Sequence, residues 1–267
     1  MPGVHHREPE SSIDRRSADV AIVCSHHTEL RPLIRKLDRQ KNYVEDGAVF
    51  RGGFVEENLR VAIVEAGSGF ARHRHLTETL IREHHPAWVI SVGFSSGLAS
   101  GMKSGDVALA TDICDTHGNS LPVKCSIPGS KRVFVGKHVV TDSHPAAACD
   151  RQKLAESSSA LAVDTTSLAV AQACESSEEG QPAACRFMSI RGILGDPEAD
   201  IPAQILGVLF QPVPPPKGGA LQKWTGRLRP DPSLKEWSEL ATETALNMNR
   251  FLFSIIQQLA EKFGKSR

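Results

Sequence analysis

The sequence has no excess charge of either sign, no long apolar run and no paired cysteine motif. Its 31 Lys and Arg residues balance 31 Asp and Glu residues, so no overall electrostatic field draws the chain to nucleic acid or to an anionic membrane. No apolar run approaches the roughly 20 residues that a transmembrane helix needs. We therefore expect no nucleic-acid partner and no membrane span.

The six cysteines are scattered along the chain and form no C-x-x-C pair. They are Cys24, Cys114, Cys125, Cys149, Cys174 and Cys185. Several lie in apolar segments, where a free cysteine behaves as a small hydrophobic residue. This usage is typical of a reducing compartment, so we expect a cytoplasmic protein. Residues 1–18 are polar and lack the apolar core of a signal peptide, which predicts a disordered leader before a domain over 19–267.

Short apolar runs alternate with helical patterns over most of the chain. The expected buried strands cover residues 20–24, 48–55, 59–65, 88–92, 107–110, 133–135, 138–141, 160–163 and 186–190. The expected helices cover residues 29–38, 71–85, 165–175 and 233–263. This alternation predicts a single α/β domain with a central mixed β-sheet flanked by helices. The Pro-rich stretch at about 211–232 cannot continue a helix or a central strand, so it is either a lid or subunit contact, or a solvated connector.

The carboxyl end of the expected strand 88–92 is the first place to look for a ligand. The strand is followed by Gly93, Phe94, Ser95, Ser96 and Gly97, which we interpret as a turn of mainly small residues. Glycines let a ligand approach backbone N–H groups closely. Because ligands of open α/β sheets bind at the carboxyl ends of strands, this segment marks the candidate active site.

Four segments occur in an order that identifies a family resemblance. They are the first strand with the residues up to Glu29, the Gly67-Ser-Gly69 run, residues 92–106, and residues 162–169 followed by 191–196. Their order and spacing resemble the purine nucleoside phosphorylase and nucleosidase superfamily, which includes methylthioadenosine/adenosylhomocysteine nucleosidase. The stretch 200–204 and the Pro-rich insertion look closer to the hopanoid-associated phosphorylase branch. The resemblance covers residues 20–201 and the final helix.

The resemblance implies a nucleoside phosphorylase-like fold and an enzyme that cleaves the N-ribosidic bond of a purine nucleoside or a related ribosyl compound. The transition state of that reaction resembles an oxocarbenium ion, so the leaving base needs a proton and the sugar hydroxyls need acceptors. Water or phosphate attacks the sugar, and no cofactor is implied beyond phosphate as a co-substrate. The resemblance also implies a homo-oligomer. The alternative is a catalytically weakened member that binds a nucleoside-like ligand or serves in an assembly.

Two carboxylates are the catalytic candidates that the resemblance implies. Glu29 stands where the nucleosidases have a glutamate that positions water; alternatively, it is a first-turn carboxylate favoured by the helix dipole. The acid of the superfamily falls at Gly195, one residue before Asp196. A bulge at Gly195 would bring Asp196 into the site as the general acid. The alternative makes Asp196 a solvated carboxylate before a turn at Pro197.

The ribose-binding glutamate of the superfamily is replaced here by Thr166. A hydroxyl can accept a hydrogen bond but lacks the charge and the bidentate reach of a carboxylate. Alternatively, Thr165 and Thr166 only cap a helix. Phe94 either crowds the pocket or stacks on a ligand ring. The substrate-binding candidates are Gly67, Phe94, Ser95, Ser96, Ser143, Asp164, Thr165 and Thr166.

Weaker patterns do not change this interpretation. His26 and His27 near Cys24, and Cys114 near His117, do not supply four ligands at structural zinc spacing, so we expect no metal. The Gly67-Ser-Gly69 run lacks the third glycine of a dinucleotide fingerprint. Residues 72–75 (Arg-His-Arg-His) are either phosphate ligands at a helix N-terminus or an ordinary polar helix face. Next to Ser143, His144 falls where the superfamily has residues that contact the base, unless Pro145 makes this segment a simple turn.

Overall fold

The computed structural model describes residues 17–56, 59–123, 127, 129–175, 185–210 and 232–264. Nearly all of the predicted leader and the predicted Pro-rich insertion therefore lie outside the described residues. Ala18, at the end of the predicted leader, is buried, and its N–H donates to the carbonyl of His84. Among the described helices, none combines the length and the apolar character that a bilayer crossing requires.

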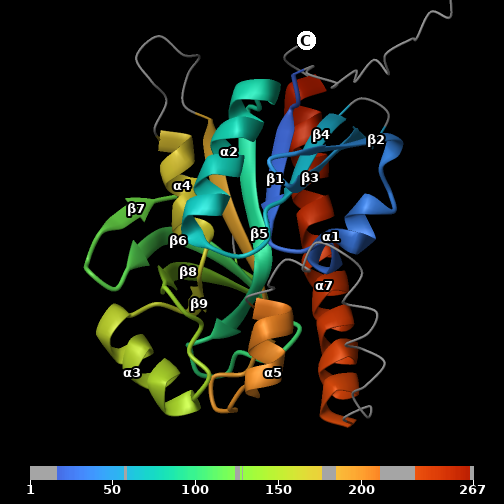
Figure 1. The fold of residues 1–267 in the computed structure, drawn as a ribbon. Helices are drawn as coiled ribbons and strands as arrows, with labels where there is room; N and C mark the ends of the chain where they lie inside the picture. The colour runs from blue at the N-terminus through green and yellow to red at the C-terminus, as the bar shows by residue number, and fades with distance from the viewer. Residues whose placement is uncertain are drawn as a thin grey trace, which may run out of the picture.

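A mixed sheet of ten described strands organises the molecule (Figure 1). The strands are β1 (Val20–Cys24), β2 (Asp38–Glu45), β3 (Ala48–Val55), β4 (Leu59–Glu65), β5 (Trp88–Gly97), β6 (Val107–Asp115), β7 (Ser120–Pro122), β8 (Val133–Val140), β9 (Ala162–Asp164) and β10 (Arg186–Gly195). Their order is β10-β6-β8-β9-β5-β1-β4-β3-β2, with β7 beside β6 and a further pairing between β10 and β5. Because β5 pairs with β1, β9 and β10, one half of the sheet closes on itself and the other half stays open.

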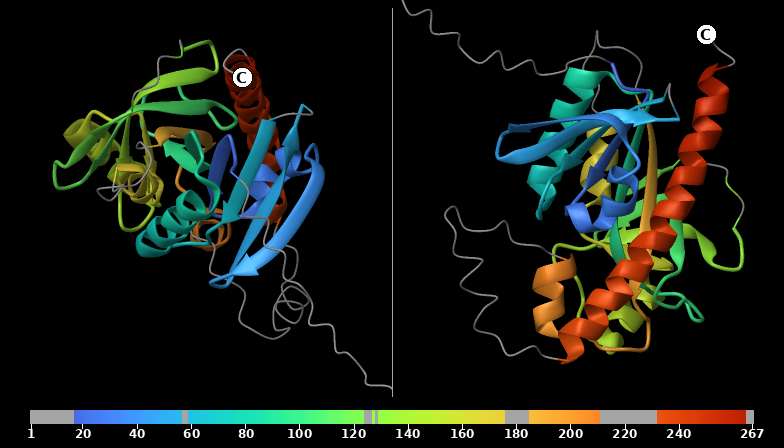
Figure 2. Two further views of the ribbon diagram at one scale, coloured as in Figure 1. Left: turned by 90° about the horizontal axis from the view of Figure 1, so that it is seen from above. Right: turned by 90° about the vertical axis from the view of Figure 1, so that its right-hand side faces the viewer.

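Helices cover both faces of the sheet, as Figures 1 and 2 show. They are α1 (His27–Ile34), α2 (Phe70–His84), α3 (Ala148–Ser158), α4 (Ser167–Glu175), α5 (Ala203–Ile205), the π-helix η1 (Leu206–Phe210) and α7 (Pro232–Gly264). Apolar residues of α1 and α7 form one core cluster with strands of the sheet, and those of α2 and α4 form another. The predicted class, a central mixed sheet flanked by helices in a single α/β domain, is confirmed.

Strand β5 lies at the centre of this arrangement. All ten of its residues are buried. Ile90 and Val92 pack in the cluster under α1 and α7, whereas Val89 packs in the cluster under α2 and α4. A strand covered on both faces needs apolar residues at consecutive positions, which is the pattern of residues 88–92. The predicted interior position of this strand is confirmed.

The predicted turn at residues 93–97 is wrong, because these residues continue β5. Gly93 pairs with Arg191 of β10, and Ser96 pairs both with Gly195 of β10 and with Val163 of β9. Small residues are needed here because large side chains from neighbouring elements occupy the space above the strand.

Other differences occur where the sequence has no apolar periodicity. The predicted helix 29–38 ends at Ile34, and residues 38–45 form β2, whose side chains are mostly exposed. Helix α3 was not predicted, because Arg151 is its only buried residue and it carries no apolar stripe. Two short predicted strands at 133–141 are the single strand β8. Apolar periodicity, which arises when one face of a strand or helix is buried, is the signal used to predict these elements. Elements that are mostly exposed lack this signal.

Close packing of α7 on β10 generates a stability prediction. A Cβ on Gly192 would lie 2.8 Å from Thr244 Cγ2 and 3.2 Å from Met248 Sδ. Gly192→Ala should therefore lower the free energy of unfolding by about 1–3 kcal/mol, the usual cost of overpacking. Gly207→Ala is the control, because its added Cβ meets nothing within 4 Å. Equal denaturant midpoints for both variants would show that α7 does not pack on β10 in this way.

Candidate functional site

Glu29 connects α1 with the middle of β5. Its Oε2 accepts the N–H groups of Ser25 at 2.8 Å and His26 at 3.0 Å, which forms part of a capping box for α1. Its Oε1 accepts the N–H of Phe94 at 3.2 Å. Glu29 therefore lies in the first turn of α1, as the alternative interpretation predicts, and completes a capping box there; it also reaches the β5 segment where the sequence places the site.

The carboxyl of Glu29 titrates near neutral pH. Burial raises its pKa to about 7, against the lowering effect of the N–H groups of His26 and Phe94 and of the Arg191 guanidinium. Because this pKa lies above the ordinary value, protonation of Glu29 stabilises the fold at low pH, and that contribution is lost as the pH rises through about 7. A buried carboxyl with such a pKa is typical of functional sites.

A buried ion pair lies beside Glu29. Arg191 Nε donates to Asp164 Oδ2 at 3.1 Å, and Arg191 Nη2 donates to Ser91 Oγ at 2.7 Å. Asp164 Oδ1 also accepts the N–H groups of Thr166 and Ser167, both at 2.7 Å, at the start of α4. Burial alone would raise the pKa of Asp164, but Arg191 and these backbone donors hold it well below its ordinary value. The ion pair therefore links β10 to β5 and to the start of α4.

Glu29, Arg191, Asp164 and Thr166 form one continuous group of neighbours. A Cβ on Gly93 would lie 3.2 Å from Glu29 Oε1 and 3.1 Å from Arg191 Nη1, so both side chains meet above this glycine. Arg191 donates a hydrogen bond to Asp164, and Asp164 accepts one from the N–H of Thr166. Glu29 and Thr166, which are far apart in the sequence, are thus connected through Arg191 and Asp164.

Gly67 is connected to this group by Ser25, the residue after β1, whose N–H donates to Glu29. The N–H of Gly67 donates to the carbonyl of Ser25 at 3.0 Å, and Ser25 Oγ lies 3.3 Å from His73 Nε2. Burial lowers the pKa of His73 to about 4, so its ring is neutral at neutral pH. In the same Arg-His-Arg-His run, Arg72 donates to backbone carbonyls of neighbouring loops, which is a structural role.

Ser95 and Ser96 make different contacts at the end of β5. Ser95 Oγ donates to the carbonyl of Val163 at 2.7 Å and so ties β5 to β9. Ser96 Oγ lies 2.8 Å from His144 Nε2. It also occupies the space next to Gly195, because a Cβ on Gly195 would collide with it. Burial lowers the pKa of His144 to about 3, so the ring is neutral.

The carboxylate of Asp196 faces the loop between β5 and β6. Its Oδ1 accepts hydrogen bonds from the N–H and the Oγ of Ser104, both at 2.6 Å, and its Oδ2 lies 3.9 Å from Lys103 Nζ. The register of β10 shifts at Gly195, where the sequence predicts a bulge. The hydrogen bonds of Asp196 thus go to the β5–β6 loop, whereas those of Glu29 go to β5 and to the loop after β1.

The remaining candidates lie around this group. The side chain of Phe94 packs with Phe210 in an apolar cluster under α7, which is a core position. Ser143 is exposed, and its carbonyl accepts a hydrogen bond from Thr141. Thr165 is half-buried between Asp164 and Thr166. The structure thus brings Glu29, Gly67, Asp164 and Thr166 together and places Phe94 in the core.

The buried residues His138, Arg191 and Arg151 were not among the sequence candidates. Burial lowers the pKa of His138, in β8, to about 4. The nearby charges of Asp164 and Arg191 have smaller and opposite effects on this pKa. Within the described residues, neither ring nitrogen of His138 has a hydrogen-bond partner. The available signal was a charged or polar residue inside an apolar strand, which fits both His138 and Arg191. His73 had a weaker signal, as part of a polar run. Over the same described residues, no group of three or more His, Cys, Asp or Glu could hold a metal ion.

Arg151 of α3 joins the loops that carry His144 and Asp196. Its Nη1 donates to the carbonyls of Pro145 at 2.9 Å and Ala146 at 2.7 Å. Its Nη2 donates to the carbonyl of Asp196 at 3.2 Å and to that of Ala199. A buried guanidinium with several backbone acceptors fixes the loops that supply them, so Arg151 positions both segments.

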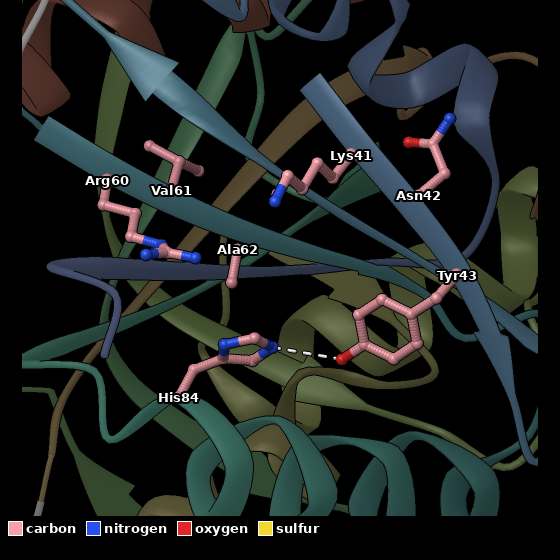
Figure 3. A pocket seen from close by; sticks show the side chains of 8 residues that line it. Lys41, Asn42, Tyr43, Arg60, Val61, Ala62 and His84 are labelled. Carbon is pink, nitrogen blue, oxygen red and sulfur yellow. Dashed lines mark hydrogen bonds between the residues drawn. The ribbon is translucent and has the colours of Figure 1, made fainter. Parts of the chain in front are cut away.

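A separate hollow opens beside the amino-terminal half of β4 (Figure 3). Its empty volume is about 380 Å³, part of which is open to solvent. It is lined by Lys41, Asn42, Tyr43, Gly52, Arg60, Val61, Ala62 and His84. Tyr43 Oη and His84 Nε2 lie 3.1 Å apart across it. None of the predicted site residues lines this hollow, so it is distinct from the candidate site.

Several solved structures share this fold. The methylthioadenosine/adenosylhomocysteine nucleosidase of Colwellia psychrerythraea, in complex with adenine, has a TM-score of 0.64 at 16% identity, covering 91% of this chain and 96% of that one. The corresponding enzyme of Helicobacter pylori, with an immucillin inhibitor, also has a TM-score of 0.64 at 16% identity, covering 91% and 99%. That of Neisseria meningitidis, with methylthio-immucillin-A, has 0.63 at 16%, covering 90% and 98%. At these identities the likeness establishes the fold.

The family follows from the sequence itself. No curated protein matches the chain significantly. The family model described as the phosphorylase superfamily matches residues 19–155, which include β1, Glu29 and the whole of β5. This match covers half of the chain and agrees with the resemblance found in the order of the motifs. The chain belongs to the phosphorylase superfamily.

Proposed function

We propose that this protein cleaves the N-ribosidic bond of a purine nucleoside or a related ribosyl compound, with water or phosphate as the nucleophile. The observation that carries the proposal is the buried Glu29 carboxyl, which is bonded to the N–H of Phe94 and lies beside Arg191. Membership of the superfamily, and a fold shared with nucleosidases solved with adenine or immucillin inhibitors, support a cleaving enzyme over a protein that only binds.

Glu29 orients the nucleophile in this proposal. A carboxylate has about four lone-pair positions, and Glu29 uses three of them for backbone N–H groups. Its remaining acceptor capacity can hold a water molecule or a sugar hydroxyl. Its negative charge, in a site shielded from water, also favours the positive charge that develops on the sugar. The ionised form is therefore the active one.

Asp196 donates the proton to the leaving base in this proposal. For that step its carboxyl exchanges the two hydrogen bonds from Ser104 for one to the base. The Gly195 bulge gives the backbone the freedom to make this change. In the structure, Ser104 and Lys103 hold Asp196.

The proposed assembly and compartment rest on the family and on the cysteines. We propose a homo-oligomer, because the resemblance implies one, and light scattering with size exclusion measures it directly. We propose a cytoplasmic setting, because the cysteines lie singly in mainly apolar segments, a usage that suits a reducing compartment.

The pKa of Glu29 generates a prediction about pH. Turnover should rise with pH through about 7, as Glu29 loses its proton. In Glu29→Gln turnover should fall by about 10²-fold, because the nucleophile is misplaced, and the pH step should disappear. The assay is a panel of purine nucleosides, methylthioadenosine and adenosylhomocysteine, each with and without phosphate. Glu78→Gln, an exposed substitution on α2, is the control. The proposed function fails if no panel member is cleaved at any pH.

The general acid is tested separately. Asp196→Asn should reduce turnover by about 10²–10⁴-fold, the usual contribution of a positioned acid. Glu198→Gln removes a neighbouring exposed carboxylate that also lies near Lys103, and it should leave turnover unchanged. Undiminished turnover by Asp196→Asn would reject the assignment of Asp196.

Thr166 generates a prediction about the sugar. A charge-assisted hydrogen bond is worth about 1.5–3 kcal/mol, so its absence should weaken ribonucleoside binding by roughly ten- to a hundred-fold. Discrimination against 2′-deoxy analogues should be weak, and Thr166→Glu should tighten ribonucleosides selectively. Titration calorimetry on both proteins, with Thr242→Glu on the exposed face of α7 as control, measures this. Tight binding by the wild type with strong rejection of the 2′-deoxy form would show that the sugar lies elsewhere.

A further inference from the structure

Two cysteines meet between α4 and β10, away from the candidate site. Cys174 lies in the last turn of α4, and Cys185 is the residue directly before β10. Both belong to the apolar cluster under α2 and α4, where Cys174 is buried and Cys185 is partly buried. Both are free thiols. Eleven positions apart in the sequence, they are neighbours in the fold.

The two thiols lie in the same cluster and are close enough to interact with each other. This interaction raises the pKa of Cys174, which keeps its proton, and lowers the pKa of Cys185. By contrast, the thiols of Cys24 and Cys114 donate to backbone carbonyls. Cys174 and Cys185 thus combine a more acidic, partly accessible sulfur with a buried sulfur next to it.

We propose that Cys174 and Cys185 are a redox-active pair that a peroxide converts to an intramolecular disulfide. The thiolate of Cys185 attacks one peroxide oxygen; an S–O bond forms, the O–O bond breaks and hydroxide leaves, giving a sulfenic acid. The sulfur of Cys174 then attacks that of Cys185; the S–S bond forms, the S–O bond breaks and the second hydroxide leaves. The two thiol protons convert both hydroxides to water. The two thiols are oxidised by two electrons, and hydrogen peroxide is reduced to two waters.

The geometry favours this product over further oxidation of a single sulfur. Because both thiols lie in one cluster and interact, the sulfur of Cys174 is close to the sulfenic acid formed on Cys185, and the disulfide needs the two side chains to rotate toward each other. A small thiol reverses the reaction by exchange. The disulfide joins the end of α4 to the start of β10, and β10 also carries Arg191, whose partner Asp164 accepts the N–H of Ser167 at the start of α4. The inference does not depend on the proposed reaction.

The test is a titration of the full chain with hydrogen peroxide, followed by alkylation and peptide mapping by mass spectrometry. We expect a cross-link between the Cys174 and Cys185 peptides, with the loss of two hydrogens, which dithiothreitol reverses. Closing this short loop should also raise the Tm by about 5–10 °C.

Two matched variants decide the outcome. Cys185→Ser should lose both the cross-link and the increase in Tm, whereas Cys149→Ser, which changes an exposed cysteine elsewhere, should keep both. Cys185→Ala serves in place of Cys185→Ser if the latter does not fold. Equal alkylation of Cys185 before and after peroxide, or its conversion to a sulfinic acid without the cross-link, would overturn the proposal. So would a cross-link that joins Cys185 to any cysteine other than Cys174.

Discussion

The buried ion pair between Arg191 and Asp164 is the interaction on which the site depends. Each partner is nearly inaccessible to water, so removing one would leave an uncompensated charge in the core. Such a loss usually costs about 3–5 kcal/mol. The pair is also fully integrated: Arg191 donates to Ser91 of β5, and Asp164 accepts two N–H groups at the start of α4. It therefore fixes β5, β10 and α4 relative to one another.

The small residues of β5 follow from this pair. Arg191 and Glu29 reach across the strand, and the space they occupy is where a side chain at position 93 would lie. Ser91 supplies a hydroxyl that accepts from Arg191 instead of an apolar side chain that would displace it. A segment that looks like a turn in the sequence is thus a central strand in which Gly93 leaves room for two long charged side chains.

The sequence predicted structure correctly where the pattern of residues nearby in the chain determines that structure. The apolar runs located most strands of the sheet, and the motif order located Glu29, Asp164 and Thr166 in one group. The direction of Asp196 could not be read in this way, because it depends on Ser104, which is 92 residues away along the chain and comes from another loop. The role of Arg151 was hidden for the same reason: its acceptors are carbonyls, which every residue has.

The space beside Gly195, the position that the resemblance assigns to the superfamily's acid, is filled by other side chains. A Cβ on Gly195 would collide with Ser96 and come within 2.8 Å of Ile201, and Ser96 is itself held by His144. An aspartate could not be restored at Gly195 without moving these neighbours. The need for a glycine at position 195 therefore depends on the Ser96–His144 contact. Arg151 holds the two loops that carry His144 and Asp196 on either side of it. In the proposed reaction the proton for the leaving base therefore comes from beside Gly195, and Asp196 is the adjacent carboxylate, next to the register shift of β10.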